Sequence, residues 1–304
     1  MSILVVGSVA LDTIETPAGK SSDILGGSAT YFSIAARLFT SVQLVAIVGN
    51  DLSADALKPL RRPGIDTSGL VVASGKTFRW SGRYHADFNT RTTLATELNV
   101  FAHFRPELPA TFAQAPCVFL ANIDPDLQLD VLRQARAPAL VASDTIDLWI
   151  RTKRERLLEV LRQVDLFFIN DEEAKLLAET PHLWHAARWL LRRGPQVVVI
   201  KKGEHGSMLC HGPHRFFAPA YPLEEIRDPT GAGDTFAGGV LGYLARAGWR
   251  RASHEPTLRR AVVHGAALAS FCVEGVGVSA LARVTPVSLR RRVEAFRRLT
   301  HLDG

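Results

Sequence analysis

The stretch with the clearest chemical potential is residues 228–236, which read Asp-Pro-Thr-Gly-Ala-Gly-Asp-Thr-Phe. An apolar helical pattern follows over 237–245, so Gly231, Ala232 and Gly233 lie at the start of a predicted helix. Because these residues have small side chains or none, their backbone N–H groups are left uncovered. Uncovered amides at the positive end of a helix dipole bind anions. Asp234 in the first helical turn is ordinarily a capping residue, but beside a phosphoryl group a carboxylate can also take the proton of an attacking hydroxyl. The stretch therefore predicts an anion-binding loop with a candidate general base.

Alternating strands and helices are predicted to position this loop. Short apolar runs rich in Val, Ile and Phe predict strands over 3–7, 42–49, 118–121, 139–143, 166–170 and 197–201. Amphipathic stretches between them predict helices over 28–39, 55–61, 126–134, 154–161, 172–178 and 185–191. This alternation is typical of an α/β fold with a mostly parallel central sheet and helices on both faces. No repeat or linker divides the chain, so residues 1–304 are expected to form a single domain.

Residues 77–98 depart from the alternation of strands and helices, because large and polar side chains alternate on both sides of a turn at 89–91. A period of two predicts a β-hairpin, and a small β flap on an α/β body often closes over a ligand. Trp80 and Tyr84 have the same parity, so they project from one side of the flap. That side faces either a pocket or a dimer contact, and the alternative is a solvent-facing edge without a ligand role.

Composition excludes several classes of protein. With 47% hydrophobic and 22% charged residues, the chain is not disordered, collagen-like or a coiled coil throughout. Its net charge of +6 is spread along the sequence, which favours solvated helix faces over nucleic-acid binding. The three cysteines are far apart, so we expect buried thiols in a reducing compartment. The N-terminus enters an apolar strand directly and 261–282 contains His264 and Glu274, so we expect no signal peptide, no membrane partner and a cytoplasmic protein.

The stretch from 228 to 234 resembles the C-terminal signature of the PfkB, or ribokinase-like, family of carbohydrate kinases. By this resemblance Asp234 is the catalytic base, and the amides of residues 231–233 form the anion hole for the transferred phosphate. Asp228 would lie near the substrate or at a monovalent-cation site, with Thr230 beside it. Walker and Rossmann glycine patterns, which would indicate other nucleotide-binding folds, are absent from the sequence.

Further motifs extend the resemblance over nearly the whole chain. Residues 7–12 resemble the family's first strand with its substrate-binding aspartate, Asp12, and Gly26-Gly27 resembles the turn at which the sugar approaches the backbone. The sequence Gly-Ile-Asp-Thr-Ser-Gly at 64–69 is also similar to a sequence found in the family, and it is predicted to form a turn that leads into the flap. Ribokinases carry a substrate-binding glutamate after the strand corresponding to 118–121; here Asp124 is the nearest match and Asn122 a second candidate.

The motifs that resemble the family's nucleotide-binding segments lie later in the chain. Asn170 and Glu173 are similar to the family's Asn-x-x-Glu motif, which organises water and Mg²⁺ around the phosphates; a helix capping box is the alternative. The string at 199–206 resembles the nucleotide-side strand and loop, which implies nucleotide contacts from Lys202, Gly203 and Gly206. Small side chains that leave room for an adenine include Ala267 and Ser270, although they could instead serve tight helix packing.

The resemblance implies an ATP-dependent, Mg²⁺-requiring kinase that phosphorylates a primary hydroxyl of a sugar or sugar-like substrate. A loop at 274–279 could offer carbonyl groups to K⁺ beside Asp228. Asp12, Gly27 and Asp124 suit sugar hydroxyls, whereas the flat faces of Tyr31, Trp80 and Tyr84 could stack a nucleobase. A sugar is favoured, and the alternatives are a nucleoside kinase of the same fold and an inactive ligand-binding relative. Residues at about 11–25 and 73–101 are expected to form the lid, through which a homodimer could also form.

Overall fold

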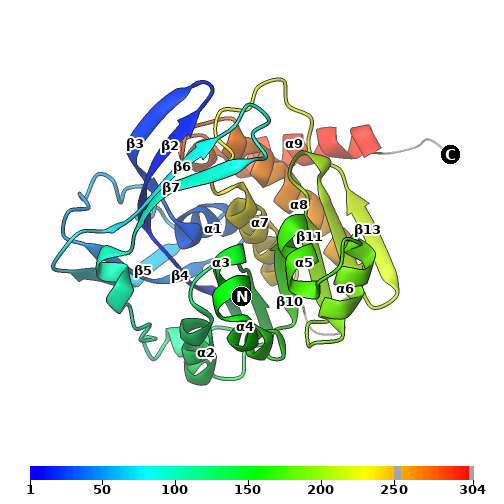
Figure 1. Cartoon of the computed structure of the whole chain (residues 1–304), viewed down its shortest axis with the longest axis horizontal. Coiled ribbons are helices and arrows are strands. Elements are labelled where there is room, and N and C mark those ends of the chain that lie inside the picture. The colour runs from blue at the N-terminus through cyan, green and yellow to red at the C-terminus, as the bar shows by residue number, and fades with distance from the viewer. Residues whose placement is uncertain (250–254, 301–304) are drawn as a thin grey trace.

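A nine-stranded sheet forms the centre of the fold in the order β13-β12-β11-β10-β9-β8-β1-β4-β5 (Figure 1). The structure is a computed structural model and describes residues 1–249 and 255–300. All neighbouring pairs from β5 to β11 are parallel, and β12 and β13 extend the sheet in antiparallel fashion. The strands of this sheet are β1 (Ile3–Val6), β4 (Val42–Gly49), β5 (Ile65–Ala73), β8 (Cys117–Leu120), β9 (Leu140–Ser143), β10 (Leu166–Asn170), β11 (Val197–Lys201), β12 (Ser207–His211) and β13 (His214–Ala218).

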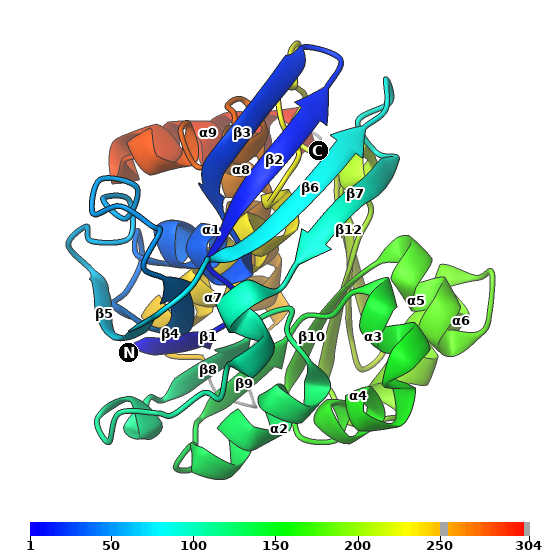
Figure 2. The ribbon, with the colours of Figure 1, turned by 60° about the vertical axis from the view of Figure 1, so that its left-hand side comes forward.

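Helices cover both faces of this sheet (Figures 1 and 2). In β1, Ile3 and Val5 belong to one hydrophobic core and Leu4 and Val6 to the other, because successive side chains of a strand point to opposite faces. The first core includes residues of α1 (Ser28–Ala36), α7 (Ala232–Arg246), α8 (Glu255–Val273) and α9 (Pro286–Thr300). The second includes residues of α2 (Pro125–Gln134), α3 (Asp147–Thr152), α4 (Arg154–Leu161), α5 (Asp171–Ala178) and α6 (Leu183–Leu191). Four short 3-10 helices complete the described elements: η1 (Asn99–His103), η2 (Phe112–Gln114), η3 (Gly203–His205) and η4 (Leu281–Arg283).

A separate four-stranded sheet projects beyond this body, as Figure 2 shows. Its order is β3 (Gly19–Gly26), β2 (Ala10–Thr16), β6 (Phe78–Tyr84) and β7 (Arg91–Glu97). Strands β6 and β7 pair in antiparallel fashion, which confirms the predicted hairpin. Asp12 and Ile14 of β2 are buried while Thr13 between them is not, so one face of this small sheet is turned toward the rest of the molecule.

Two local predictions were wrong. Residues 55–61 form successive turns and no helix, because Pro59 lacks an amide proton and its ring clashes with the preceding helical turn. The string at 64–69 begins the edge strand β5 instead of a turn into the flap. Its turn-like composition reflects a bulge, where the Ser68 N–H donates to Asp66 Oδ1 at 2.9 Å and the pairing with β4 shifts register.

The cysteines and the apolar stretch at 261–282 lie within the body of the molecule. Cys117, Cys210 and Cys272 are free thiols, and all are buried. Across residues 1–249 and 255–300, none of the helices combines the length and the apolar character needed to span a bilayer. The apolar stretch at 261–282 is a buried part of α8 followed by a loop, as predicted.

Candidate active site

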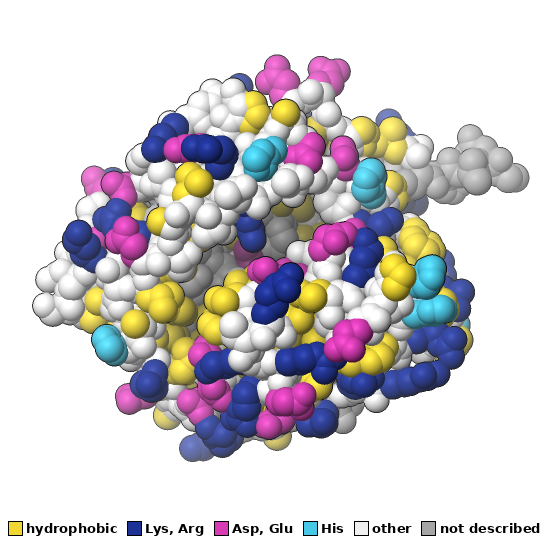
Figure 3. Space-filling view, viewed as in Figure 1, with side chains coloured by type: hydrophobic (Ala, Val, Ile, Leu, Met, Phe, Trp, Pro, Cys, Tyr) yellow, Lys and Arg dark blue, Asp and Glu magenta, His cyan; other side chains and the backbone are white. Residues whose placement is uncertain are grey.

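The N-terminus of α7 opens into a hollow in the face shown in Figure 3, where both acidic and basic side chains border the depression. Gly231 caps this helix with a φ of 73°, and a Cβ there would lie 2.3 Å from the Tyr31 ring, so only glycine fits. The Ala232 N–H donates to Pro229 O at 3.2 Å. Among the described residues, the N–H groups of Gly231 and Gly233 have no acceptor. Two of the three predicted amides are thus available to an anion.

Asp234 lies in the first turn of α7, beside these amides. Burial raises the pKa of its carboxyl to about 7, and the Asp144 carboxylate adds to the rise, while Lys201 and Arg91 oppose it. A carboxyl that titrates near neutral pH accepts a proton more readily than an ordinary aspartate. The position therefore suits a general base.

Lys201 is the residue at this site that the sequence analysis missed. Its ammonium pairs with Asp144, which follows β9 directly, and it lies 3.2 Å from where a Cβ on Gly233 would be. Burial alone would lower the pKa of Lys201, but Asp144 and Glu173 outweigh burial and raise it. A permanent positive charge thus lies at the opening of α7. Lys202, the residue named from the sequence, does not line the cavity described next.

A cavity of about 430 Å³ extends from Lys201 and Gly233 toward α8 and the loop after β13. The predicted Gly203, Gly206 and Ser270 line it. Ala267 does not: it is 0% exposed and packs in the first core. Lining residues of α8 recur at positions 266, 269, 270 and 273, the spacing of one helix face, and position 267 falls outside that face.

Carboxylates gather on the side of α7 that faces the small sheet. Asp12 of β2 is 4% exposed and lies beside the backbone N–H of Gly27, which lowers the pKa of its carboxyl. A Cβ on Gly26 would lie 1.9 Å from Asp12 Oδ2, so the missing side chain makes room for this carboxylate. Burial, with Asp228 and Asp234 nearby, raises the pKa of Asp12 to about 8. The structure thus brings the predicted acceptor-side aspartate close to the candidate base.

Asp228 is held by backbone donors on both oxygens. Thr230 N–H donates to Oδ1 at 2.9 Å and Gly277 N–H to Oδ2 at 2.8 Å, and burial raises the pKa of this carboxyl. The loop at 274–279 does reach Asp228, but it presents an N–H group where carbonyls were expected. Among the described residues no group of three or more His, Cys, Asp or Glu could hold a metal ion. A monovalent cation beside Asp228 stays a prediction.

The three aromatic residues proposed to frame the acceptor have different surroundings. Tyr31 is 1% exposed, its ring lies beneath Gly231 and its hydroxyl has no hydrogen-bond partner among the described residues, so it supports the loop and offers no stacking face. Tyr84 receives a hydrogen bond from Thr230 Oγ1 at 3.2 Å. Trp80 covers Gly82 and lies 5.3 Å below the Arg91 guanidinium. Of these three aromatic residues, Trp80 is therefore the one that remains partly exposed.

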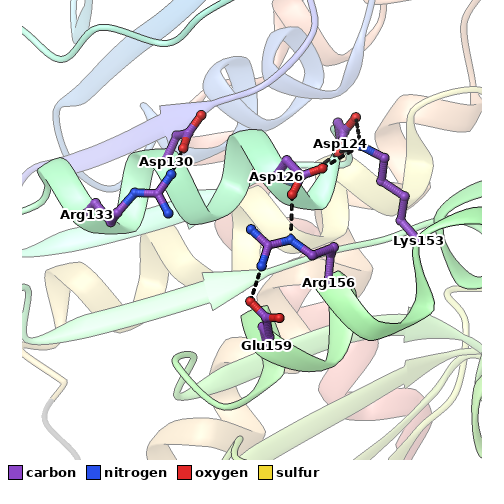
Figure 4. A network of polar contacts seen from close by, with 7 residues as sticks. All are labelled: Asp124, Asp126, Asp130, Arg133, Lys153, Arg156 and Glu159. Carbon is purple, nitrogen blue, oxygen red and sulfur yellow. Dashed lines mark hydrogen bonds and ion pairs between the residues drawn. The ribbon is translucent and has the colours of Figure 1, made fainter.

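Asp124 belongs to an ion-pair network (Figure 4). It caps α2 by accepting from the Asp126 N–H, and both of its oxygens lie within 2.9 Å of Lys153 Nζ. Its carboxylate is thus already neutralised by an ammonium group. Asn122 accepts a hydrogen bond from Trp149 Nε1 at 3.1 Å through Oδ1.

Asn170 and Glu173 form a complete capping box at the start of α5. Asn170 N–H donates to Glu173 Oε2 at 2.9 Å, and Glu173 N–H donates to Asn170 Oδ1 at 2.8 Å. Burial raises the pKa of Glu173 to about 7; Lys201 opposes the rise and Asp144 adds to it. The structural alternative left open by the sequence is therefore present, and the same carboxyl interacts electrostatically with the Lys201–Asp144 pair.

Comparisons with known proteins identify the family and the fold. Residues 2–284 match the pfkB family of carbohydrate kinases. A cytidine kinase of Thermococcus kodakarensis is 31% identical over 81% of this chain and 89% of its own length. The structure of a Burkholderia thailandensis nucleoside kinase in complex with inosine superimposes with a TM-score of 0.78 at 19% identity, covering 96% of this chain and 97% of that one. A double mutant of Vibrio cholerae O395 fructokinase bound to fructose, ADP and potassium gives 0.76 at 17% identity, covering 96% and 98%. The fold is thus ribokinase-like, and the chain belongs to the pfkB family of carbohydrate kinases and is a phosphotransferase with an alcohol acceptor.

Proposed function

We propose that the protein is an ATP-dependent nucleoside kinase that transfers the γ-phosphoryl group to the primary hydroxyl of the ribose. The observation that carries the transfer is the placement of Asp234 between buried Asp12 on one side and the 430 Å³ cavity on the other, at the open N-terminus of α7. The preference for a nucleoside rests on the 31%-identical cytidine kinase. The sequence alone favoured a free sugar, with a nucleoside as the alternative; the proposal reverses that order.

The residues of the chain divide the chemistry between them. Asp12 accepts hydrogen bonds from ribose hydroxyls, and Trp80 offers its partly exposed ring to the base. Asp234 takes the proton of the primary hydroxyl as that oxygen attacks phosphorus. The free N–H groups of Gly231 and Gly233 and the Lys201 ammonium stabilise the negative charge that develops on the phosphoryl oxygens.

The cavity suits a nucleoside triphosphate with its phosphates toward α7. Its volume lies in the usual range for small-molecule sites, and its positive end is formed by Lys201 and the helix N-terminus. Mg²⁺, when bound with ATP, would neutralise charge on the phosphates; kinases generally hold it through phosphates, waters and one or two carboxylates. The Glu173 carboxyl, near Lys201 and Asp144, is the group we assign to water-mediated Mg²⁺ contact.

The nature of the acceptor is tested by ADP release from a panel of cytidine, uridine, inosine and adenosine against ribose, deoxyribose and fructose. We expect kcat/KM for the best nucleoside to exceed that for ribose by about tenfold or more, because base stacking contributes roughly 1–3 kcal/mol. Trp80→Ala should remove most of this difference, while Trp184→Ala on α6, outside the site, should not. A free sugar as the best substrate of the wild-type protein would contradict the nucleoside assignment.

Asp12→Asn is expected to abolish tight acceptor binding and yet to stabilise the ligand-free protein at alkaline pH. The pKa of Asp12 is raised to about 8, so its folded state favours the protonated form. Its contribution to stability is present below the ordinary aspartate pKa and is lost as pH rises through about 8. At pH 9 the variant should melt a few degrees above wild type, since ~1 kcal/mol moves Tm by roughly 2–4 °C in a large domain.

Thermal melting of both proteins at pH 5 and pH 9 checks this expectation. The Tm difference should be smaller at pH 5, where Asp12 of the folded protein is still protonated, than at pH 9. Asp66→Asn, a change at an exposed carboxylate in β5, serves as the matched control. A Tm difference that is the same at both pH values would contradict the buried charge at Asp12.

A further inference from the structure

The turn of the β6–β7 hairpin, residues 85–90, lies against the loop on the nucleotide side of the site, and we call it the hairpin tip (Figure 1). Asn89 Nδ2 donates to Glu204 Oε1 at 2.8 Å, joining the small sheet to η3. Asn89 Oδ1 lies 2.6 Å from where a Cβ on Gly203 would be, and Gly203 has a φ of 52°. The glycine therefore allows the hairpin tip to approach this closely.

The hairpin tip has a defined shape. The Asp87 carboxylate accepts hydrogen bonds from the N–H groups of Asn89 and Thr90 and from Thr90 Oγ1. Phe88 N–H donates to His85 O at 2.9 Å, and Phe88 adopts a φ of 53°. The left-handed region is unfavourable for a bulky aromatic residue, so the surrounding hydrogen bonds must hold it there.

This backbone conformation places Phe88 at the cavity. Phe88 is half-buried and lines the 430 Å³ space together with Tyr221, Leu223 and Ile226 of the segment after β13. This wall is apolar and aromatic, whereas Lys201 and Gly233, which also line the cavity, lie at the positive end of α7. Asp87 and Glu204 line the cavity near Phe88, and their negative charge disfavours phosphate there. Charge therefore orients a nucleotide with its base toward the hairpin tip.

The same hairpin also reaches the acceptor side. Tyr84, the last residue of β6, accepts a hydrogen bond from Thr230 Oγ1, and Trp80 precedes it by four residues on the same face. Asp12 pairs in register with Trp80 across β2 and β6. One hairpin thus contacts residues on both the nucleotide side and the acceptor side of the site.

We propose that Phe88 contacts the base of the nucleotide, so that the hairpin tip forms one wall of the nucleotide site. This proposal rests on the proposed function for the identity of the donor.

Calorimetric titration with Mg²⁺-ADP and no acceptor tests the contact. Phe88→Ala should raise the Kd about tenfold, the loss expected for one aromatic contact to a base, and Phe88→Trp should restore affinity. The matched control is Leu94→Ala on β7, which is 43% exposed and outside the cavity. An unchanged Kd in Phe88→Ala would overturn the proposal and leave the proposed function intact. Failure of the wild-type protein to bind Mg²⁺-ADP would overturn both.

Discussion

Asp234→Asn is expected to lower kcat by roughly 10²–10⁴-fold, the usual effect of removing a general base. The amide keeps the size of the carboxylate but cannot accept the proton of the attacking hydroxyl. Because Asp234 is a half-buried carboxyl whose pKa is raised to about 7, the variant should be at least as stable as wild type near pH 8. Kinetics at saturating ATP and acceptor, together with thermal melting, separate loss of the base from loss of the fold.

The pH dependence of kcat provides the control for this change. In the wild-type protein kcat should rise through pH 7, as Asp234 loses its proton, and level off above it. The residual activity of Asp234→Asn should lack this rise. Near-normal turnover of the variant, with the wild-type pH profile, would remove Asp234 from the mechanism.

Lys201→Met should have the second largest effect, because it acts on both the charge at α7 and the stability of the site. The substitution removes the ammonium beside Gly233 and leaves Asp144, which is 2% exposed, without its ion-pair partner. Breaking a buried pair from one side typically costs about 3–5 kcal/mol. We expect a clear fall in Tm and a loss in kcat of about 10²-fold, the scale for removing one preorganised stabilising group.

Two further variants separate catalysis from stability at Lys201. Lys202→Met changes the neighbouring lysine, which does not line the cavity, and should leave both Tm and kcat close to wild type. The double change Lys201→Met and Asp144→Asn removes the unpaired charge, so it should recover much of the Tm but not the rate. Recovery of wild-type kcat in the double variant would show that Lys201 has only a structural role.

The large sheet was predictable because its strands are short apolar runs that are buried on both faces. Runs such as 166–170 and 197–201 match β10 and β11 to the residue. The errors occur where local composition points to another structure. Pro59 prevents the helix expected at 55–61, and the turn-forming residues at 64–69 belong to a bulge in an edge strand.

The site was less predictable, because a side chain's direction depends on strand parity and helix phase. Val197 and Val199 pack in the core with α7, so Lys201, of the same parity, points toward that helix and Lys202 does not line the cavity. On α8, Ala267 falls outside the face that lines the cavity, although its neighbour Ala266 lies on it.

Some contacts at the site have no local signal in the sequence. Lys153, which neutralises Asp124, is 29 residues away along the chain. Likewise the hairpin tip meets η3 through Asn89 and Glu204, which are 115 residues apart. Such pairs form only when the tertiary fold brings distant segments together, so the sequence could not assign Asp124 to an ion pair or place the tip at the cavity.

The central claim is that this chain moves the γ-phosphoryl group of ATP to the primary hydroxyl of a nucleoside, and ³¹P NMR of the reaction mixture tests it most directly. With the protein, Mg²⁺, ATP and the best nucleoside of the panel, we expect ADP and the nucleoside 5′-monophosphate to appear in equal amounts. A 5′-deoxynucleoside, which lacks the acceptor hydroxyl, should give neither product. Formation of ADP with inorganic phosphate alone, or of a phosphorylated free sugar with no nucleoside monophosphate, would contradict the account.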